Sequence, residues 1–495
     1  MLSSIVFLPL VAAALLAVLR VPDRAARATW MAVTAADLAL VVALVLGYET
    51  PVDGGLAFEE RARWIPSVGS SWHVGVDGIS LPLVALTAVV FCACAVYGLR
   101  ETRRPRQLAA LFLALQTTCL GLFVAQDLIV FFVFFDLSIV GMYAAIAGWG
   151  HGRAAGRSAL QFFLYTFLGS LALLLGFIGL YLGADPHTFD IPELVAAAPL
   201  ADSPVAGGFV LAALLVGLAV KTPTVPFHTW LPPAHTDASA IGSAVLAAVL
   251  LKMGTYGFVR IAMPVLPGAW QAAAWVVLGV GIASVLYGAL VALAQTDLKR
   301  MIAYTSINHM GYVVVAVGAA GLAGGDAAAR EVAVTGAVTQ MVSHGLVTGA
   351  LFLLAGVLHD RTGSYAMGGF GGLAGRAPGW SGLFAVAAFA SLGIPGFSGF
   401  VAEFQVFAGS IGAAAWAAIA LPGIVLTAAL FLRALQQLVT GPPGELTPRF
   451  SDVRAPEWLP VTGLLLLSLA VGVLPGPLLD LITPAGAAVV DLVSR

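Results

Sequence analysis

The chain has 495 residues, of which 60% are hydrophobic and only 10% are charged, and its net charge is −2. A soluble protein of this length could not bury so much apolar surface, so most of that surface must face lipid. The near-neutral charge argues against binding to nucleic acid. We find no P-loop, no dinucleotide-binding glycine motif and no haem-attachment motif. The composition therefore predicts an all-α polytopic membrane protein.

Charged residues are confined to short clusters between apolar runs of roughly 20 residues, the length of a membrane-spanning helix. The first run begins at Met1 without a basic leader or a cleavage site, so we interpret it as a retained span. About 14 transmembrane helices are predicted in chain order, over residues 2–19, 29–47, 79–99, 108–125, 128–149, 158–183, 208–230, 238–262, 271–295, 299–320, 332–358, 381–409, 412–439 and 459–481.

The loop charges assign the two sides of the membrane. If the N-terminus is outside, 15 of the Lys and Arg residues in loops fall on the cytoplasmic side and 5 on the other. Lys299 is one of the 15. Because positive residues favour cytoplasmic loops, we predict a multi-pass protein of the cell (inner) membrane with both termini outside.

Features of the first half of the chain recur in the same order in the second half. The pairs are separated by 170, 179 and 172 residues, and they are Asp127 and Asp297, Gln161 and Gln340, and Pro223 and Pro395. We infer two five-helix repeats, spans 4–8 and 9–13, which are inverted because five is odd. Pro223 and Pro395 predict broken helices 7 and 12, and transport folds place the ion path at such breaks. The predicted parts are residues 1–107, 108–262, 271–439 and 440–495, the last comprising helix 14 and a tail.

Four ionisable residues fall deep inside predicted spans: Asp136, Lys221, Lys252 and Glu403. Each would cost about 2.5–3.5 kcal/mol at the bilayer centre, so each is a functional candidate. Lys221 is followed directly by a proline-broken stretch, and the natural partner for its charge is Asp136. The alternatives are a snorkelling lysine and acids that are protonated and structural. Asp37, in span 2, has no evident role.

Histidines extend this set. His309 and His344 lie in spans 10 and 11, and a histidine can pass protons by using both ring nitrogens. We expect His228 and His235 to have a structural or gating role, with relay membership as the alternative. Arg433 is either a counter-ion or a snorkelling residue. No metal cluster or nucleophile–base pair competes with this set, so the sequence predicts proton transfer.

Four stretches carry a resemblance to a known family: KTPTVPFHTWLPPAHTDASAIGSAVLAAVLLKMGTYG, YTSINHMGYVVVAVG, MVSHGLVTGALFLLAG and GIPGFSGFVAEF. The chain resembles the antiporter-like subunits of respiratory complex I over essentially its whole length. Subunits L and N of that group, and the D subunit of Mrp-type antiporters, usually carry lysine in span 12. The M subunits carry glutamate there, which Glu403 matches.

The resemblance implies a subunit of a membrane arm whose proton pumping is driven by redox chemistry in other subunits. It assigns a pair to Asp136 and Lys221, a central lysine to Lys252, bridging histidines to His309 and His344, and an exit acid to Glu403. The implied partners are other membrane-arm subunits, and no cofactor is implied within this subunit.

Two departures from the family pattern stand out. Asp136 is one methylene shorter than the family's usual glutamate, which leaves a direct contact with Lys221 open. The loop that follows the break reads LPPAH instead of LPDAH. An Mrp-type cation/proton antiporter, a membrane-bound hydrogenase subunit and a purely structural membrane subunit are the alternatives.

Overall fold

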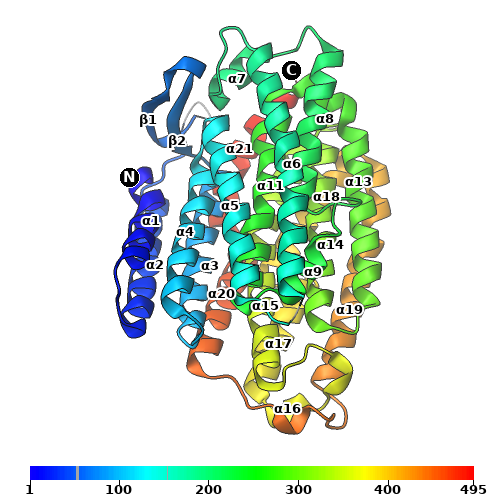
Figure 1. Cartoon of the computed structure of the whole chain (residues 1–495). Helices are drawn as coiled ribbons and strands as arrows, with labels where there is room; N and C mark the ends of the chain where they lie inside the picture. Colours follow the sequence, from blue (N-terminus) through cyan, green and yellow to red (C-terminus); the bar gives the residue numbers. More distant parts are fainter. Residues whose placement is uncertain (52–54, 153, 495) are drawn as a thin grey trace.

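The computed structural model describes residues 1–51, 55–152 and 154–494, and it is almost entirely helical (Figure 1). Arg153 and Arg495, two of the loop charges counted above, lie outside the described residues. Long helices run side by side between two ends of the molecule. We call the end that carries the β-hairpin and α7 the hairpin end.

Three helices and the hairpin form the N-terminal part. The helices are α1 (Leu2–Val18), α2 (Asp23–Leu46) and α3 (Ser80–Gly98). The strands β1 (Ala57–Ile65) and β2 (Ser70–Val76) pair antiparallel, with Ala57 opposite Val76. The amino group of Met1 forms an ion pair with Glu60 of β1, which fixes the N-terminus at the hairpin end.

The first predicted repeat corresponds to five membrane-crossing segments, of which the fourth is interrupted. Its elements are α4 (Pro105–Val124), α5 (Leu128–Trp149), α6 (Ala155–Gly183), α7 (Ile191–Ala197), α8 (Pro204–Lys221), α9 (Leu231–Asp237), α10 (Ala240–Val245), α11 (Leu251–Gly257) and α12 (Met263–Val265). Two π-helical turns, Leu246–Leu250 and Phe258–Ala262, join α10, α11 and α12 into one continuous helix.

The second predicted repeat again has an interruption in its fourth segment. Its elements are α13 (Pro267–Leu293), α14 (Leu298–Ala320), α15 (Ala327–Thr362), α16 (Leu373–Arg376), α17 (Pro378–Ser391), α18 (Ser398–Ala413) and α19 (Pro422–Leu438).

The two units begin their second helix in the same way. Asp127 caps α5 by accepting the backbone N–H groups of Ile129 and Val130, and Asp297 caps α14 by accepting that of Arg300. The next residue in each case donates its N–H to the loop that follows the third helix, namely to Phe189 and to Tyr365, at 2.9 Å in both. We call these two arrangements the hairpin-end anchor and the opposite-end anchor.

The C-terminal part departs from the sequence prediction. A single span over 459–481 is expected, whereas the structure has α20 (Ala455–Val473) and a separate α21 (Gly476–Ser494). Pro475 and Pro477 cause the separation, because proline removes a backbone donor and clashes with the preceding turn. The predicted tail is therefore a second helix.

Contacts show that α21 lies across the hairpin end of other helices. The backbone of Gly78, just before α3, packs against the carbonyl of Leu481. Gln271 of α13 donates to the carbonyl of Val493. Arg330 of α15 donates to Ser494 Oγ at 2.9 Å. Both ends of the chain therefore lie at the hairpin end (Figure 1).

Within the described residues, 13 helices are long and apolar enough to cross a membrane, and 12 of them coincide with predicted spans. The thirteenth is α21. Two predicted spans are absent from that set, because α1 has only 17 residues and segment 381–409 is divided between α17 and α18. The chain is a multi-pass membrane protein. Its most buried spanning segments are Ala240–Val265, α14 and α15, which form the centre of the bundle.

Candidate functional site

The first interruption follows Lys221 directly. Pro223 and Pro226 cannot donate backbone hydrogen bonds, so the helix cannot continue through residues 222–230. The freed groups are satisfied from within the protein, as a membrane interior requires. The N–H of Val225 donates to Ser284 Oγ at 3.0 Å. The buried indole of Trp230 donates to the backbone carbonyl of Val220, also at 3.0 Å.

Lys221 is only 2% exposed, and its ammonium group has two partners on α5. Nζ donates to Ser138 Oγ at 2.9 Å and lies 4.6 Å from the centre of the Phe135 ring. No ion pair with Asp136 forms among the described residues, and Asp136 Oδ1 has no hydrogen-bond partner there. Positions two apart on a helix point about 200° from each other. Because Ser138 faces Lys221, the short Asp136 side chain faces away.

Lys252 lies at the centre of the bundle and is fully buried. Its Nζ donates to the carbonyl of Ala247 at 2.6 Å and lies 2.6 Å from His344 Nδ1. A π-helical turn ends two residues before Lys252 and another begins six residues after it. Such turns are rare and are frequent at functional sites.

A close helix contact joins the turn of Lys252 to the end of α8. A methyl group at Gly254 would lie 2.3 Å from Thr222 Oγ1 and 2.8 Å from the carbonyl of Leu218. Only glycine permits this approach. It brings the residue after Lys221 against the helix that carries Lys252.

A row of polar groups continues from Lys252 to Glu403. The rings of His344 and His309 are 5.5 Å apart, and His309 Nε2 is 3.9 Å from Glu403 Oε1. These three side chains line a cavity of about 10 Å³, which is close to the space needed for one water molecule. The Nε2 atoms of both histidines have no other hydrogen-bond partner in the described part of the chain. Gln340 Oε1 and Ser391 Oγ, on the same cavity, are likewise unpaired there.

The second interruption, residues 392–397, contains Pro395 and lies beside Glu403. Gly393 has a φ of +74°, and a methyl group on it would lie 2.6 Å from Glu403 Oε2. Both observations require glycine at this position. The carboxyl group of Glu403 therefore packs onto the broken backbone and also faces His309.

Three supporting residues named from the sequence form no hydrogen bond or ion pair with this row in the described part of the chain: His228, His235 and Arg433. His228 is in the first interruption, with its ring 4.9 Å from that of Tyr287. His235, on α9, is fully buried and stacks on Phe352 at 4.4 Å. Arg433 donates to the carbonyl of Leu293 at the C-terminal end of α13, where a cation is favoured by the helix dipole.

Three buried polar residues were missed by the sequence analysis. Lys299, counted above as a loop charge, is fully buried and donates to the carbonyl of Ala238 at 2.5 Å. The sequence feature that could have revealed this is Asp297, because a helix cap at that position places Lys299 in the first turn of α14. Ser138 was missed because its role depends on a contact with α8. Gln116 was also missed; its Nε2 donates to Asp37 Oδ2 at 2.5 Å and so gives that acid a partner.

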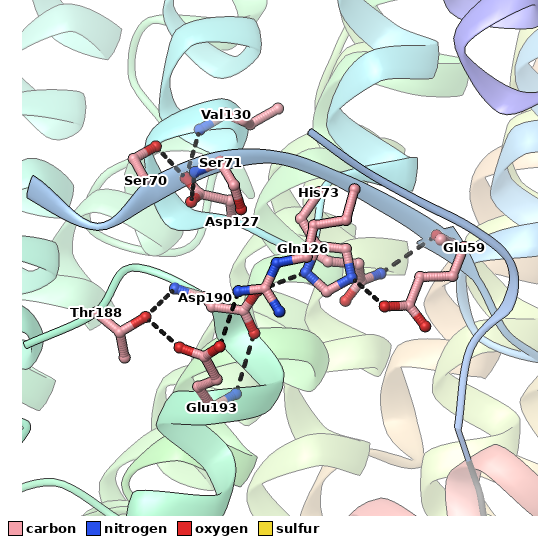
Figure 2. Close-up of polar contacts among 12 residues, drawn as sticks. Glu59, Ser70, Ser71, His73, Gln126, Asp127, Val130, Thr188, Asp190 and Glu193 are labelled. Carbon is pink, nitrogen blue, oxygen red and sulfur yellow. Dashed lines mark hydrogen bonds and ion pairs between the residues drawn. The ribbon is translucent and has the colours of Figure 1, made fainter. Parts of the chain in front are cut away.

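The hairpin-end anchor carries its own charged cluster (Figure 2). His73 Nδ1 lies 2.5 Å from Asp190 Oδ2, and His73 Nε2 lies 2.9 Å from Glu59 Oε1. Arg61 pairs with Asp190 at 3.3 Å and with Glu193 at 2.8 Å. Burial lowers the pKa of His73, but the two carboxylates outweigh it and the pKa is raised above its usual range. The cluster ties the hairpin to the N-terminus of α7.

Comparison with known proteins agrees with this architecture. Residues 125–430 match the family described as "NADH:quinone oxidoreductase/Mrp antiporter, TM". The NADH-quinone oxidoreductase subunit M of Rhodobacter capsulatus is 38% identical over 508 residues, which cover 99% of this chain and 96% of that protein.

Solved structures are also similar. A chain of respiratory complex I from Thermus thermophilus matches with a TM-score of 0.90 and 31% identity, covering 100% of both chains. A chain of the Mrp complex from Dietzia sp. DQ12-45-1b matches with a TM-score of 0.87, covering 100% of this chain and 99% of that one. At 23% identity, that second likeness shows the fold alone. The chain belongs to the family of membrane subunits shared by NADH:quinone oxidoreductases and Mrp antiporters.

Proposed function

We propose that the chain is the M-type membrane subunit of an NADH–quinone oxidoreductase and that it moves protons across the membrane. The redox chemistry and its cofactors belong to other subunits, and neighbouring membrane-arm subunits are the partners. The full-length similarity to subunit M of Rhodobacter capsulatus supports this assembly. The positive-inside pattern supports a cell-membrane location with the hairpin end outside.

The observation that carries the proton-transfer role is the row from Lys252 through His344 and His309 to Glu403. Its first link is 2.6 Å long and its last is 3.9 Å. The cavity between them has room for about one water molecule and is lined by nitrogen and oxygen atoms that have no other partner among the described residues. A neutral histidine has one donor and one acceptor nitrogen, so it can take a proton on one side and release one on the other.

In this proposal Lys221 controls the charge at the start of the row. When its ammonium group pairs with the carboxylate of Asp136, it repels a proton on Lys252 less than when it is unpaired. Loss of the pairing between Lys221 and Asp136 therefore favours release of the Lys252 proton to His344. The proton then passes His309 and reaches Glu403 beside the second interruption.

The test compares Lys252→Ala and Glu403→Ala with the wild-type protein in membrane vesicles that contain the assembled complex. NADH-driven proton pumping should fall by about 100-fold or more in each, because each variant removes a proton-carrying group. Arg433→Ala is the matched control, since it removes a charge from a spanning segment outside the row. Full pumping by either relay variant would refute the proposal.

Dependence on NADH separates this function from its main rival. An Mrp-type antiporter would exchange cations for protons in vesicles without NADH. A purely structural subunit would leave pumping unchanged when Lys221, Lys252 and Glu403 are replaced together.

A further inference from the structure

The contact between Lys221 and Ser138 is not part of the row described above. We propose that Ser138 is a positioning residue: it holds the ammonium group of Lys221 away from Asp136 in the resting arrangement. This inference rests on the proposed function, because it concerns the group that controls the row.

The hydrogen bonding of Ser138 makes its oxygen an acceptor towards Lys221. Ser138 Oγ donates its own proton to the carbonyl of Phe135 at 2.6 Å. Its lone pairs are then free to accept, and a lysine ammonium has only donors to offer. The face of the Phe135 ring, 4.6 Å from Nζ, adds a cation–π contact. Together they form a site for a protonated lysine without any carboxylate.

The helix geometry places this site and Asp136 on different faces of α5. Phe135 and Ser138 are three apart and share a face of α5, whereas Asp136 points about 200° away from Ser138. Lys221 is the last residue of α8, so its long side chain is anchored next to an irregular segment. Its ammonium can therefore contact either the Ser138 site or Asp136, but the two contacts exclude each other.

The short side chain of Asp136 explains why Lys221 needs a second acceptor at Ser138. A side chain that ends one methylene earlier cannot extend as far around α5 towards Lys221. Without Ser138, the buried ammonium would have no oxygen acceptor among the described residues when it is not paired with Asp136, and burying an unpaired charge is strongly unfavourable. Ser138 thus makes the unpaired arrangement of Lys221 stable enough to be populated.

The test uses the pH dependence of NADH-driven pumping by the assembled complex. Besides Lys221 itself, the titratable groups that act on this site are Cys119 of α4 and Asp136 of α5, and Ser138 does not titrate. Ser138→Ala removes a hydrogen bond to a charged group, so the alkaline limb of the pH–rate profile should move to lower pH by about one unit. Ser138→Thr keeps the hydroxyl group and should restore the wild-type profile.

Two further variants make the test specific. Ser306→Ala is the matched control, since Ser306 is a buried serine of α14 whose hydroxyl donates to the carbonyl of Ile302 in the preceding turn and to no other group that the structure describes. It should leave the profile unchanged. The double variant of Ser138→Ala and Asp136→Asn should show non-additive effects, because the two side chains compete for one ammonium group.

The outcomes separate this inference from the proposed function. If Ser138→Ala has the wild-type profile while Lys221→Ala loses pumping, Ser138 has no positioning role and the proposed function stands. A lower rate without a pH shift, or failure of threonine to rescue, would show a structural role only and overturn the inference. Normal pumping by Lys221→Ala would refute the role in proton release that the proposed function assigns to Lys221.

Discussion

The two interruptions carry opposite charges on opposite sides of their gaps. Lys221 is the last residue before the first gap, whereas Glu403 follows the second gap by two turns of α18. The C-terminal end of a helix carries partial negative charge and the N-terminal end partial positive charge. Side chains on a helix also lean towards its N-terminus, which carries the Glu403 carboxyl back to Gly393. Each gap therefore has, next to its charged side chain, the helix end whose partial charge is opposite in sign.

The gaps are also held in different ways. The first contains two prolines, and its backbone is fixed by Ser284 and by the indole of Trp230. The second contains Gly393 and Gly396, both with positive φ, and its acid packs directly on the backbone. The first gap thus depends on side chains from elsewhere, and the second on the absence of side chains. This difference predicts which substitutions each gap tolerates.

The largest expected effect comes from the charges themselves. Lys221→Met and Glu403→Gln each remove ionisation while keeping a similar volume, so NADH-driven pumping should fall by about 100-fold. Lys221→Glu should be at least as damaging, because it places an anion at the negative end of α8. Pumping is measured in vesicles after correction for the amount of assembled complex. A better rate for Lys221→Glu than for Lys221→Met would show that the helix end does not select the charge.

A smaller effect is expected from the glycines of the second gap. Gly393→Ala and Gly396→Ala both force an L-residue into positive φ, which costs about 1–2 kcal/mol. The Gly393 methyl group would also lie 2.6 Å from Glu403 Oε2, whereas no atom of the described residues lies within 4 Å of the one at Gly396. Gly393→Ala should lower pumping by about tenfold or more, since misplacement of a reacting group by about 1 Å has effects of this size.

Gly396→Ala is the matched control for that experiment. Both alanines should lower the thermal stability of the purified complex, because both positions have a positive φ. Equal pumping by both variants would mean that the packing of Glu403 on Gly393 has no role in proton transfer.

The sequence was informative wherever a property belongs to one helix. Apolar runs located the spans, prolines located both interruptions, and buried charges identified Lys252 and Glu403. It was uninformative where a role depends on which face of one helix meets another. Ser138 and Gln116 are ordinary residues in sequence and become significant only through contacts with α8 and α2. Asp136 is a similar case: its short side chain left a direct contact with Lys221 open, and among the described residues the ammonium group instead donates to Ser138.

The tail predicted after helix 14 illustrates a further limit. The run 459–481 is apolar enough for a span, and only the contacts of α21 with Gly78, Gln271 and Arg330 show that the chain turns across the bundle.

Ser284→Ala should loosen the first gap without affecting the second. The N–H of Val225 would lose its acceptor, and an unpaired buried donor costs about 1–3 kcal/mol. Hydrogen–deuterium exchange of a peptide covering 222–230 should become about 10- to 100-fold faster in the purified complex. Ser410→Ala is the control, because the Ser410 hydroxyl has no partner among the described residues. Unchanged exchange in 222–230 would show that Ser284 does not hold the gap.

The smallest effect should distinguish the two anchors by pH. The pKa of His73 is raised above its usual 6.5 by Asp190 and Glu59, so protonated His73 stabilises the hairpin-end anchor. That stabilisation is complete below about pH 6.5 and is lost as pH rises through the raised pKa of the folded protein. After correction for intrinsic exchange, a peptide covering 57–76 should therefore exchange faster at pH 9 than at pH 6.

The opposite-end anchor provides the internal comparison for this experiment. Tyr365 pairs there with the backbone after Asp297, and among the described residues no histidine is paired with a carboxylate at that anchor. Lys299 and His359 contact Tyr365 there, but neither is held in its protonated form by an ion pair among the described residues. A peptide covering 362–370 should therefore not exchange faster at pH 9 than at pH 6. His73→Gln keeps hydrogen-bonding capacity but cannot be protonated, so it should remove the pH dependence of the hairpin. If that dependence persisted in His73→Gln, its origin would lie in other groups of the cluster, and the two anchors would differ in something other than this histidine.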